Sequence, residues 1–307
     1  MITPSTTQDE IMDLKVIKLY NDYIHGDMPR RSFLKQLGVL AGGVTAASAV
    51  LALIEPNYAY GQQVRPDDDR LQQGYVSYSG TNGAVRAYFA RPAAPGSALP
   101  GILVIHENRG LNAHIEDVAR RAALAGYIAV APDGLSHVGG TPGDQEAARD
   151  RFREAATGII TADVIAGIGY LKSREDCTGK TGSVGFCYGG GVSLKCAIAD
   201  PATDVSVAYY GRALSAEETA QVDTPLMMHY AGNDERVNAM IPAFRSSLDD
   251  YGVAYSLNMY PDTGHGFHND TSQARYDKTA AELSWQRSIN FFDHYLKSRE
   301  TLNDGKS

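Results

Sequence analysis

Three residue types that together can cleave an ester lie far apart in this 307-residue chain: Cys187, Asp234 and His265. A cysteine thiolate attacks carbonyl carbons, and an imidazole takes and returns protons near neutral pH. A buried carboxylate fixes the tautomer of the histidine and stabilises its charged form. The three residues are therefore candidates for a nucleophile, an acid and a base of one catalytic triad.

The segment around Cys187 has the pattern of a sharp turn between a strand and a helix. Gly185-Phe-Cys-Tyr-Gly189 matches the Gly-x-Ser-x-Gly nucleophile elbow with cysteine in place of serine. Glycine is expected at both ends because Cβ atoms there would collide where strand and helix pass closely. We expect strained backbone angles at Cys187, and the first N–H groups of the helix favour a thiolate. The alternative is a glycine-rich turn with a buried, inert cysteine.

Apolar runs separated by turns predict the elements that position these residues. Alternating segments at 75–78 and 85–90 flank Gly80-Thr-Asn-Gly83 and predict a β-hairpin. Further strands are predicted at 101–106, 127–132, 181–186, 205–210, 226–231 and 255–260. One helix is predicted within residues 1–29, and another begins after Asn112, its expected N-cap, and ends at Gly126. Further helices are predicted at 144–171, from Cys187 to about 200, at 241–252 and at about 272–296. This alternation predicts an α/β protein with a mostly parallel sheet and helices on both faces.

Cys187, Asp234 and His265 each follow a predicted strand. Sites in parallel sheets lie at the carboxyl ends of strands, so the three side chains are expected to meet at one edge. The order nucleophile, acid, histidine along the chain is that of α/β-hydrolases. We therefore predict the α/β-hydrolase fold.

The chain from about Tyr75 to Leu296 resembles the dienelactone hydrolase (carboxymethylenebutenolidase) family. The resemblance is carried by His106-Glu-Asn-Arg-Gly110, Ala131-Pro-Asp133, Gly185-Phe-Cys-Tyr-Gly-Gly-Gly191, Gly232-Asn-Asp234 and Gly264-His-Gly-Phe267. It implies the Cys187–His265–Asp234 triad. It also implies that Glu107 lies beside the resting cysteine and exchanges partners with it when substrate arrives. The backbone N–H groups of Asn108 and Tyr188 would form the oxyanion hole, in agreement with the donors such elbows use.

The predicted function is hydrolysis of a small ester or lactone through an acyl-thioester on Cys187, with no cofactor and no metal. The alternative is a non-catalytic binding or thiol redox-sensing protein on the same fold. Lactone-cleaving members of the family hold the substrate carboxylate with arginines after the catalytic histidine and after the Pro-Asp strand end. This chain has no arginine at 266–270 or 134–137, and the first one after His265 is Arg275. The reaction type is therefore better supported than the dienelactone substrate.

Several neighbouring residues compete with these assignments. Glu235 could replace Asp234, and His268 is expected at the rim of the site rather than as the base. Arg109 faces either the site or the solvent. The spacing of metal ligands is absent from His106, His137 and His229, which are expected in the core or at the rim. Cys177 and Cys196 are expected to be a loop residue and a helix residue rather than redox partners. The strand end at Tyr209-Tyr210 lines either the pocket or the core.

The composition of the chain limits the classes of protein to which it can belong. The chain is 43% hydrophobic and 21% charged with a formal net charge of -8, which suits an α/β domain with a large core. No basic stripe indicates a nucleic-acid partner. The three cysteines show neither a C-x-x-C spacing nor a disulfide framework. Nothing in the sequence indicates the oligomeric state.

The N-terminal region carries a targeting-like pattern. Pro29-Arg-Arg-Ser-Phe-Leu-Lys35 resembles a twin-arginine export signal, and the apolar run 37–54 suits a signal-peptide core better than a stable membrane span. This predicts periplasmic export. The alternative is a cytoplasmic protein whose uncleaved N-terminal helix or helix pair packs on the domain. Residues 1–59 are thus predicted to be an extension, 60–72 a linker and 73–307 the hydrolase domain.

Overall fold

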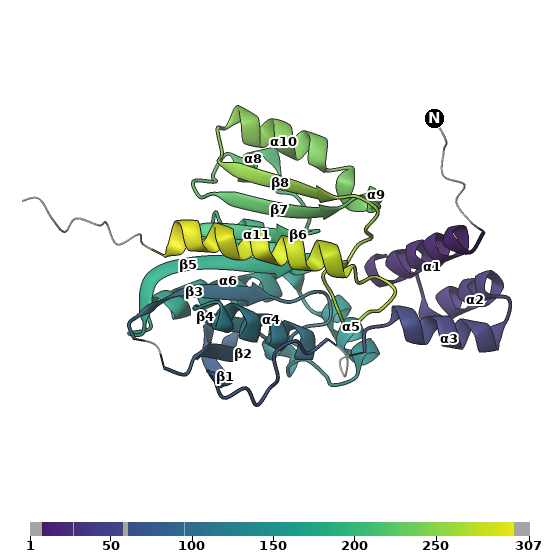
Figure 1. Cartoon of the computed structure of the whole chain (residues 1–307), viewed down its shortest axis with the longest axis horizontal. Coiled ribbons are helices and arrows are strands. Elements are labelled where there is room, and N and C mark those ends of the chain that lie inside the picture. The colour runs from purple at the N-terminus through teal and green to yellow at the C-terminus, as the bar shows by residue number, and fades with distance from the viewer. Residues whose placement is uncertain (1–7, 27, 58–60, 95, 298–307) are drawn as a thin grey trace, which may run out of the picture.

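A single eight-stranded sheet organises the protein, in the order β1-β2-β4-β3-β5-β6-β7-β8 (Figure 1). The computed structural model describes residues 8–26, 28–57, 61–94 and 96–297. The strands are β1 Leu71–Gly80, β2 Gly83–Pro92, β3 Leu99–Ile105, β4 Ile128–Pro132, β5 Cys177–Phe186, β6 Val205–Tyr209, β7 Leu226–Ala231 and β8 Tyr255–Tyr260. β2 pairs antiparallel with β1 and β4, and the other pairings are parallel. The predicted α/β-hydrolase architecture is confirmed.

Helices cover both faces of this sheet, as predicted. The helices that follow β1 in the chain are α4 Ala113–Leu124, α5 Gln145–Glu154, α6 Thr157–Lys172, α7 Tyr188–Cys196, α8 Ala216–Thr219, α9 Glu235–Asn238, α10 Ile241–Asp250 and α11 Lys278–Leu296, with a 3₁₀ turn at Ser136–Val138. Side chains alternate along β3: Ile102 and Val104 pack with α4 and α11, whereas Leu103 and Ile105 pack with α6 and α7. This double burial explains why the central strands read as continuous apolar runs.

Two of the predicted helices differ in the structure. The stretch 144–171 is not one helix but two, α5 and α6, which meet at 104° where Ala155 and Ala156 are extended. α5 turns toward the N-terminal residues, where the Arg149 guanidinium lies 4.0 Å from the centre of the Tyr23 ring, while Phe152 of α5 still packs in the core on one face of the sheet. The last helix begins at Lys278 rather than 272, because the Asp277 carboxylate accepts a hydrogen bond from Ala280 N–H and caps it.

The N-terminal residues form a folded unit of three helices, α1 Gln8–His25, α2 Arg30–Ala41 and α3 Val44–Ile54, here called the N-terminal cap. Figure 1 shows it at one end of the molecule, beside α5 and α9. Its core contains Tyr23 stacked on Phe33, with ring centres 4.3 Å apart. Within the described residues, no single helix is long and apolar enough to cross a membrane. The bent helix pairs α2–α3 and α5–α6 together have the length and apolar composition of a membrane span.

The cap is tied to the hydrolase domain by polar contacts. Arg30, the first arginine of the twin-arginine-like pair, opens α2 and forms an ion pair with Glu146 at 2.8 Å. The Asn108 side-chain amide donates to Ile24 O at 2.9 Å, and Ser272 Oγ donates to Ile54 O at 2.9 Å. The segment is therefore a helix pair packed on the domain in this structure, and export stays a prediction.

The predicted linker also packs on the domain. The Val64 side chain is buried, and its N–H donates to Asp117 Oδ1 at 2.8 Å. β1 already begins at Leu71, within the predicted linker range. The proposed boundary between residues 59 and 60 and the ends 1–7 and 298–307 lie outside the described residues. The linker is an ordered strap across α4, since its backbone satisfies buried polar groups of that helix.

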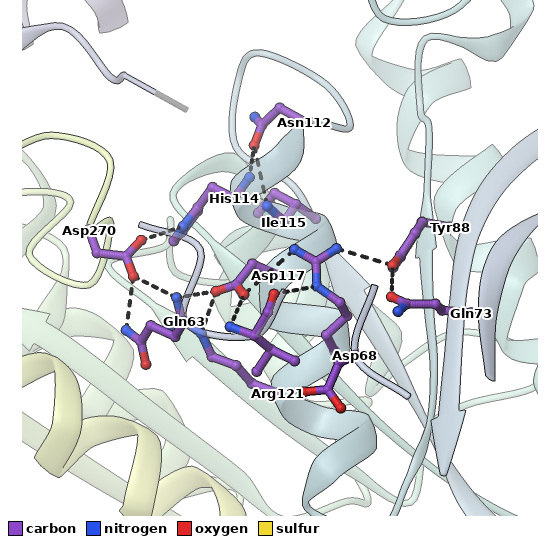
Figure 2. A network of polar contacts seen from close by, with 12 residues as sticks. Gln63, Asp68, Gln73, Tyr88, Asn112, His114, Ile115, Asp117, Arg121 and Asp270 are labelled. Atoms are coloured by element: carbon purple, nitrogen blue, oxygen red, sulfur yellow. Dashed lines mark hydrogen bonds and ion pairs between the residues drawn. The ribbon is translucent and has the colours of Figure 1, made fainter. Parts of the chain in front are cut away.

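Asp270 connects this strap, α4 and the loop after β8 (Figure 2). Its carboxylate accepts hydrogen bonds from Gln63 at 2.9 Å and Arg121 at 2.6 Å, and it contacts His114 Nδ1 at 3.0 Å. Burial alone would raise the pKa of Asp270, but His114 and Arg121 outweigh it and hold that pKa well below its usual range. The charged carboxylate thus stabilises the fold.

Replacing Asp270 with Asn is expected to lower the free energy of unfolding by about 2 kcal/mol at pH 7, because the buried Arg121 loses one of its two carboxylate partners and keeps only Asp117. The folded-state pKa is depressed, so the stabilisation is present above the unfolded pKa of about 3.9 and is lost as pH falls through the folded value. Denaturant unfolding at pH 7 and pH 3 should show the gap between variant and wild type shrinking at pH 3. The exposed Asp67→Asn change should have no measurable effect. An equal gap at both pH values would contradict this account.

Candidate active site

The elbow has the strained geometry that the glycine pattern predicts. Cys187 lies between β5 and α7 with φ 55° and ψ -114°, in a region that L-residues rarely adopt. A Cβ at Gly185 would overlap the carbonyl oxygen of Gly189, and one at Gly189 would overlap the carbonyl of Ile105. The glycines therefore let α7 pass directly over the ends of β5 and β3. The Cys187 side chain is 9% exposed, at the start of a helix.

The structure brings Cys187, Asp234 and His265 together. His265 Nδ1 lies 2.5 Å from Asp234 Oδ2, and both side chains are buried. A ring nitrogen of His265 lies within 4.8 Å of the sulfur of Cys187. Because Nδ1 is engaged by Asp234, Nε2 is the nitrogen left for the sulfur. Residues separated by up to 78 positions thus meet at the carboxyl ends of β5, β7 and β8, as predicted.

The surroundings of His265 favour the charged form of its imidazole. Burial opposes the imidazolium form of His265, but the charge of Cys187 and the Asp234 carboxylate outweigh it and raise the pKa of His265 to about 9. Burial also opposes the charged form of Asp234, yet its hydrogen bond with His265 lowers the pKa of Asp234 below the usual value. The Asp234 carboxylate further accepts a hydrogen bond from Val237 N–H at 3.3 Å, which fixes it at the start of α9. A charged imidazole beside a cysteine is one of the surroundings in which cysteines become reactive.

The residues expected from the family resemblance lie in the same region. Asn108 and Tyr188 both line the cavity at Cys187. Glu107 is buried, but its carboxylate accepts a hydrogen bond from the Asn269 side chain at 2.8 Å. The structure thus gives Glu107 a partner other than the resting cysteine. Its exchange with Cys187 stays a prediction.

His25 is the functional-site residue that the sequence did not single out. It ends α1, and its Nδ1 lies 3.9 Å from Cys187 Sγ. Its ring centre is 4.5 Å from that of His265. Burial, together with the charges of His265 and Arg236, lowers the pKa of His25 well below its ordinary value, so the imidazole is neutral at pH 7. Only the helix in the first 29 residues was foreseeable, because the residues that bind it, such as Asn108 and Arg109, lie 84 or more positions away in sequence.

Two cavities meet at His25. A cavity of about 380 Å³ contains Cys187 and is lined by Asn108 and Tyr188 on one side and by the end of α1 on the other. Three exposed arginines from different elements stand at its rim: Arg153, Arg212 and Arg236. A second cavity of about 780 Å³ runs between α1 and the loops after β7 and β8, and reaches Asp234 and His265. The cap is therefore a wall of the site.

The residues that the sequence left as alternatives for the site make contacts outside the Cys187–His265–Asp234 cluster. Glu235 is exposed and pairs with Lys18 at 3.1 Å, so it does not replace Asp234 beside His265. His268 is buried and stacks on Phe186 with ring centres 4.9 Å apart, which places it in the core and not at the rim. Arg109 is buried and donates to the Tyr20 hydroxyl at 3.1 Å, so it faces the cap.

Other histidines, cysteines and tyrosines serve the core. His106 Nε2 accepts from Gly134 N–H at 3.1 Å, and His229 contacts Ser288 Oγ at 3.0 Å. Burial raises the pKa of the Cys196 thiol to about 12, and it also raises the pKa of the Cys177 thiol. Tyr209 is also a core residue, its hydroxyl 2.8 Å from Ser288, whereas Tyr210 lines the cavity. His137 lies 3.8 Å from Asp163.

Comparison with known proteins places this site in a family. The model of the dienelactone hydrolase family matches residues 85–296. The chain belongs to the dienelactone hydrolase family. This membership confirms the predicted ester or lactone hydrolase. The match begins in β2, so the N-terminal cap lies outside it.

Relatives of this dienelactone hydrolase family member include two bacterial proteins. One, named "Putative hydrolase fragment YghX", from Escherichia coli K12, is 50% identical over 106 residues, covering 34% of this chain and 91% of its own length. Another, from Salmonella typhi, named "Putative carboxymethylenebutenolidase", is 27% identical over 247 residues, covering 76% of this chain and 91% of its own length. A crystal structure from Klebsiella pneumoniae titled "Putative Dienelactone Hydrolase" matches with a TM-score of 0.66 and 25% identity, over 73% of this chain and 99% of that one.

Proposed function

We propose that this protein hydrolyses small esters or lactones through an acyl-thioester on Cys187. One observation carries the proposal: the sulfur of a strained elbow cysteine lies within 4.8 Å of a histidine nitrogen whose ring is held by a buried aspartate. This is the nucleophile, base and orienting group of a catalytic triad. The relatives named carboxymethylenebutenolidase favour a lactone among the possible substrates.

In the acylation step, the Cys187 thiolate adds to the substrate carbonyl carbon. The backbone N–H groups of Asn108 and Tyr188 would stabilise the oxyanion, since both residues line the cavity beside the sulfur. As the C–O bond of the ester or lactone breaks, the leaving oxygen takes the proton held on His265. The products are an acyl-thioester and an alcohol or enol, which stays attached when the substrate is a lactone.

In the deacylation step, neutral His265 removes a proton from water, and the hydroxyl adds to the thioester carbonyl. The tetrahedral intermediate expels the Cys187 sulfur and leaves a carboxylic acid. Asp234 keeps His265 Nδ1 protonated throughout, so that Nε2 alone exchanges protons with the reacting atoms. The family resemblance implies that Glu107 and Cys187 exchange partners when substrate arrives, and for this the Glu107 carboxylate would have to leave Asn269.

The rim of the cavity favours an anionic substrate. Arg153, Arg212 and Arg236 supply positive charge near Cys187 at positions other than those of the family's lactone-cleaving members. Guanidinium groups pair well with carboxylates through charge-assisted hydrogen bonds. We therefore propose a small ester or lactone that also carries a carboxylate. Comparing kcat/KM for an acid-bearing enol-lactone with that for its methyl ester tests this point, and a preference for the ester would contradict it.

The thioester itself is the decisive observable. Mixing the full-length protein with a short nitrophenyl ester should release about one equivalent of nitrophenol in a burst, as acyl-enzymes do. Mass spectrometry of quenched samples should find the acyl group on the peptide that contains Cys187. Steady turnover with no acylated Cys187 would remove the mechanism. Rapid peroxide-dependent loss of the thiol without a burst would favour a redox sensor instead.

The N-terminal cap belongs to the proposed enzyme. Ile24, His25 and Gly26 line the cavity that contains Cys187, so removal of residues 1–59 would open one wall of the site. If the twin-arginine-like segment directs export, we propose that it is retained afterwards. The intact mass of the protein from its native compartment decides this, because cleavage near residue 59 would contradict it.

A further inference from the structure

Three metal-ligating side chains converge where the cap meets the elbow. One ring nitrogen of His25, the sulfur of Cys187 and one ring nitrogen of His265 all lie within 4.8 Å of one another. We infer that these three residues form a reversible Zn²⁺ site that switches the hydrolase off. The site needs the cap, since His25 is its third ligand.

The distances are close to those of a zinc complex. Zn–S and Zn–N bonds of about 2.3 and 2.0–2.1 Å place tetrahedral ligand atoms about 3.4–3.6 Å apart. His25 Nδ1 and Cys187 Sγ are already 3.9 Å apart. No pair of ligand atoms therefore needs to contract by more than about 1.4 Å. His25 is the last residue of α1, where a side-chain rotation disturbs no following turn of helix.

The histidine nitrogens are available to a metal ion. Among the described residues, the buried Nε2 atom of His265 has no hydrogen-bond partner, and Nδ1 of His25 contacts Cys187 Sγ at 3.9 Å. Asp234 holds Nδ1 of His265, so Nε2 is the nitrogen left to bind a metal ion, and it loses its proton when it does so. A carboxylate behind a histidine is the usual support of a zinc ligand, and it fixes both tautomer and ring orientation. The same Asp234–His265 pair can thus serve catalysis or metal binding, but not both at once.

The ligand set indicates which ion binds and how strongly. Thiolate with imidazole suits zinc, whereas hard cations such as Mg²⁺ prefer oxygen ligands. Three protein ligands leave the fourth position to water from the 380 Å³ cavity. The positive charges of Arg109, Arg236 and Arg275 act on His25 and oppose a divalent cation. Binding should therefore be weaker than in structural zinc sites and reversible by chelators.

Inhibition follows from the ligands. A sulfur bound to zinc cannot attack a carbonyl, and a metal on His265 Nε2 blocks proton transfer. The loss of activity on zinc binding rests on the proposed role of Cys187 as nucleophile. The binding of zinc to the three side chains does not depend on that role. Binding is therefore measured directly, so that failure of the metal site and failure of the proposed hydrolase mechanism give different results.

Isothermal titration of the metal-free full-length protein with ZnCl₂ tests the site. Wild type should bind one ion, and His25→Ala and Cys187→Ala should each weaken the affinity by more than about tenfold. The matched controls His294→Ala and Cys177→Ser change residues of the same types outside the site and should bind like wild type. With Co²⁺ as a probe, wild type should show a thiolate-to-metal charge-transfer band that Cys187→Ala lacks.

The outcomes separate the possibilities. Loss of activity in proportion to zinc occupancy, relieved by chelator, would support the whole inference. Absence of zinc binding to wild type, or equal affinity of wild type and His25→Ala, would overturn it. His25→Asn provides a second variant should His25→Ala change the thermal melting curve. One-ion binding to a protein that shows no ester turnover would retain the site and reject the hydrolase mechanism.

Discussion

Cys187→Ala protein is expected to lose at least about 10⁴-fold in kcat/KM for short activated esters, because removal of a triad nucleophile disables the whole unit. Its sulfur is the atom that faces both His265 and the cavity. Alanine leaves no atom able to form the thioester, so the burst should vanish together with steady turnover. Residual hydrolysis would come from the oxyanion donors and from substrate binding alone.

The matched control for this variant is Cys177→Ser. Cys177 begins β5 at the opposite end of the strand from the elbow, and its sulfur is not among the atoms that line the cavity. Its replacement should leave kcat/KM unchanged. Both proteins should keep the wild-type thermal melting temperature within a few degrees. A Cys187→Ala protein with near wild-type turnover would mean that another group attacks the substrate.

The elements that carry the triad were predictable because their signals are local. The elbow glycines, the apolar strands β5, β7 and β8, and the residues at their ends follow one another within short windows of sequence. Parallel strands bring their carboxyl ends to one edge, so the meeting of Cys187, Asp234 and His265 follows from topology. The same local reading chose Asp234 over Glu235, which proved to face Lys18 at the surface.

What could not be predicted depends on tertiary contacts. The pattern at 29–35 resembles an export signal, and nothing local in it shows that the segment packs on the domain, where Phe33 is fully buried in the cap. His25 reaches the site because Asn108 and Arg109 bind α1 from the β3–α4 loop. No local periodicity encodes such a contact.

The break between α5 and α6 has a similar origin. No proline or glycine separates the two helices, and helical spacing continues through Ala155 and Ala156. The competing force is packing: α5 meets the cap through Arg149, whereas α6 buries Ile160 and Val164 against the sheet. The bend places Phe152 and Arg153 at the cavity. The arginine rim could not be foreseen for the same reason.

The second large effect is expected at the acid of the triad. Asp234→Asn should lower kcat by about 10⁴-fold, since an amide donating to His265 Nδ1 selects the wrong tautomer. It also removes the negative charge that helps to hold the proton on His265. The asparagine oxygen can still accept from Val237 N–H, so the start of α9 and the fold should persist. The loss should therefore appear in kcat rather than in stability.

Glu235→Gln is the matched control, one residue along the chain. Its carboxylate is exposed and bridges only to Lys18 among the described residues, an ion pair of the kind that contributes little. Steady-state kinetics of the two variants with one ester should therefore differ by about 10⁴-fold in kcat. If Glu235→Gln lost as much activity as Asp234→Asn, the acid would have been assigned to the wrong carboxylate. If neither lost activity, the imidazole of His265 would act without an orienting anion, and the role proposed for Asp234 would be wrong.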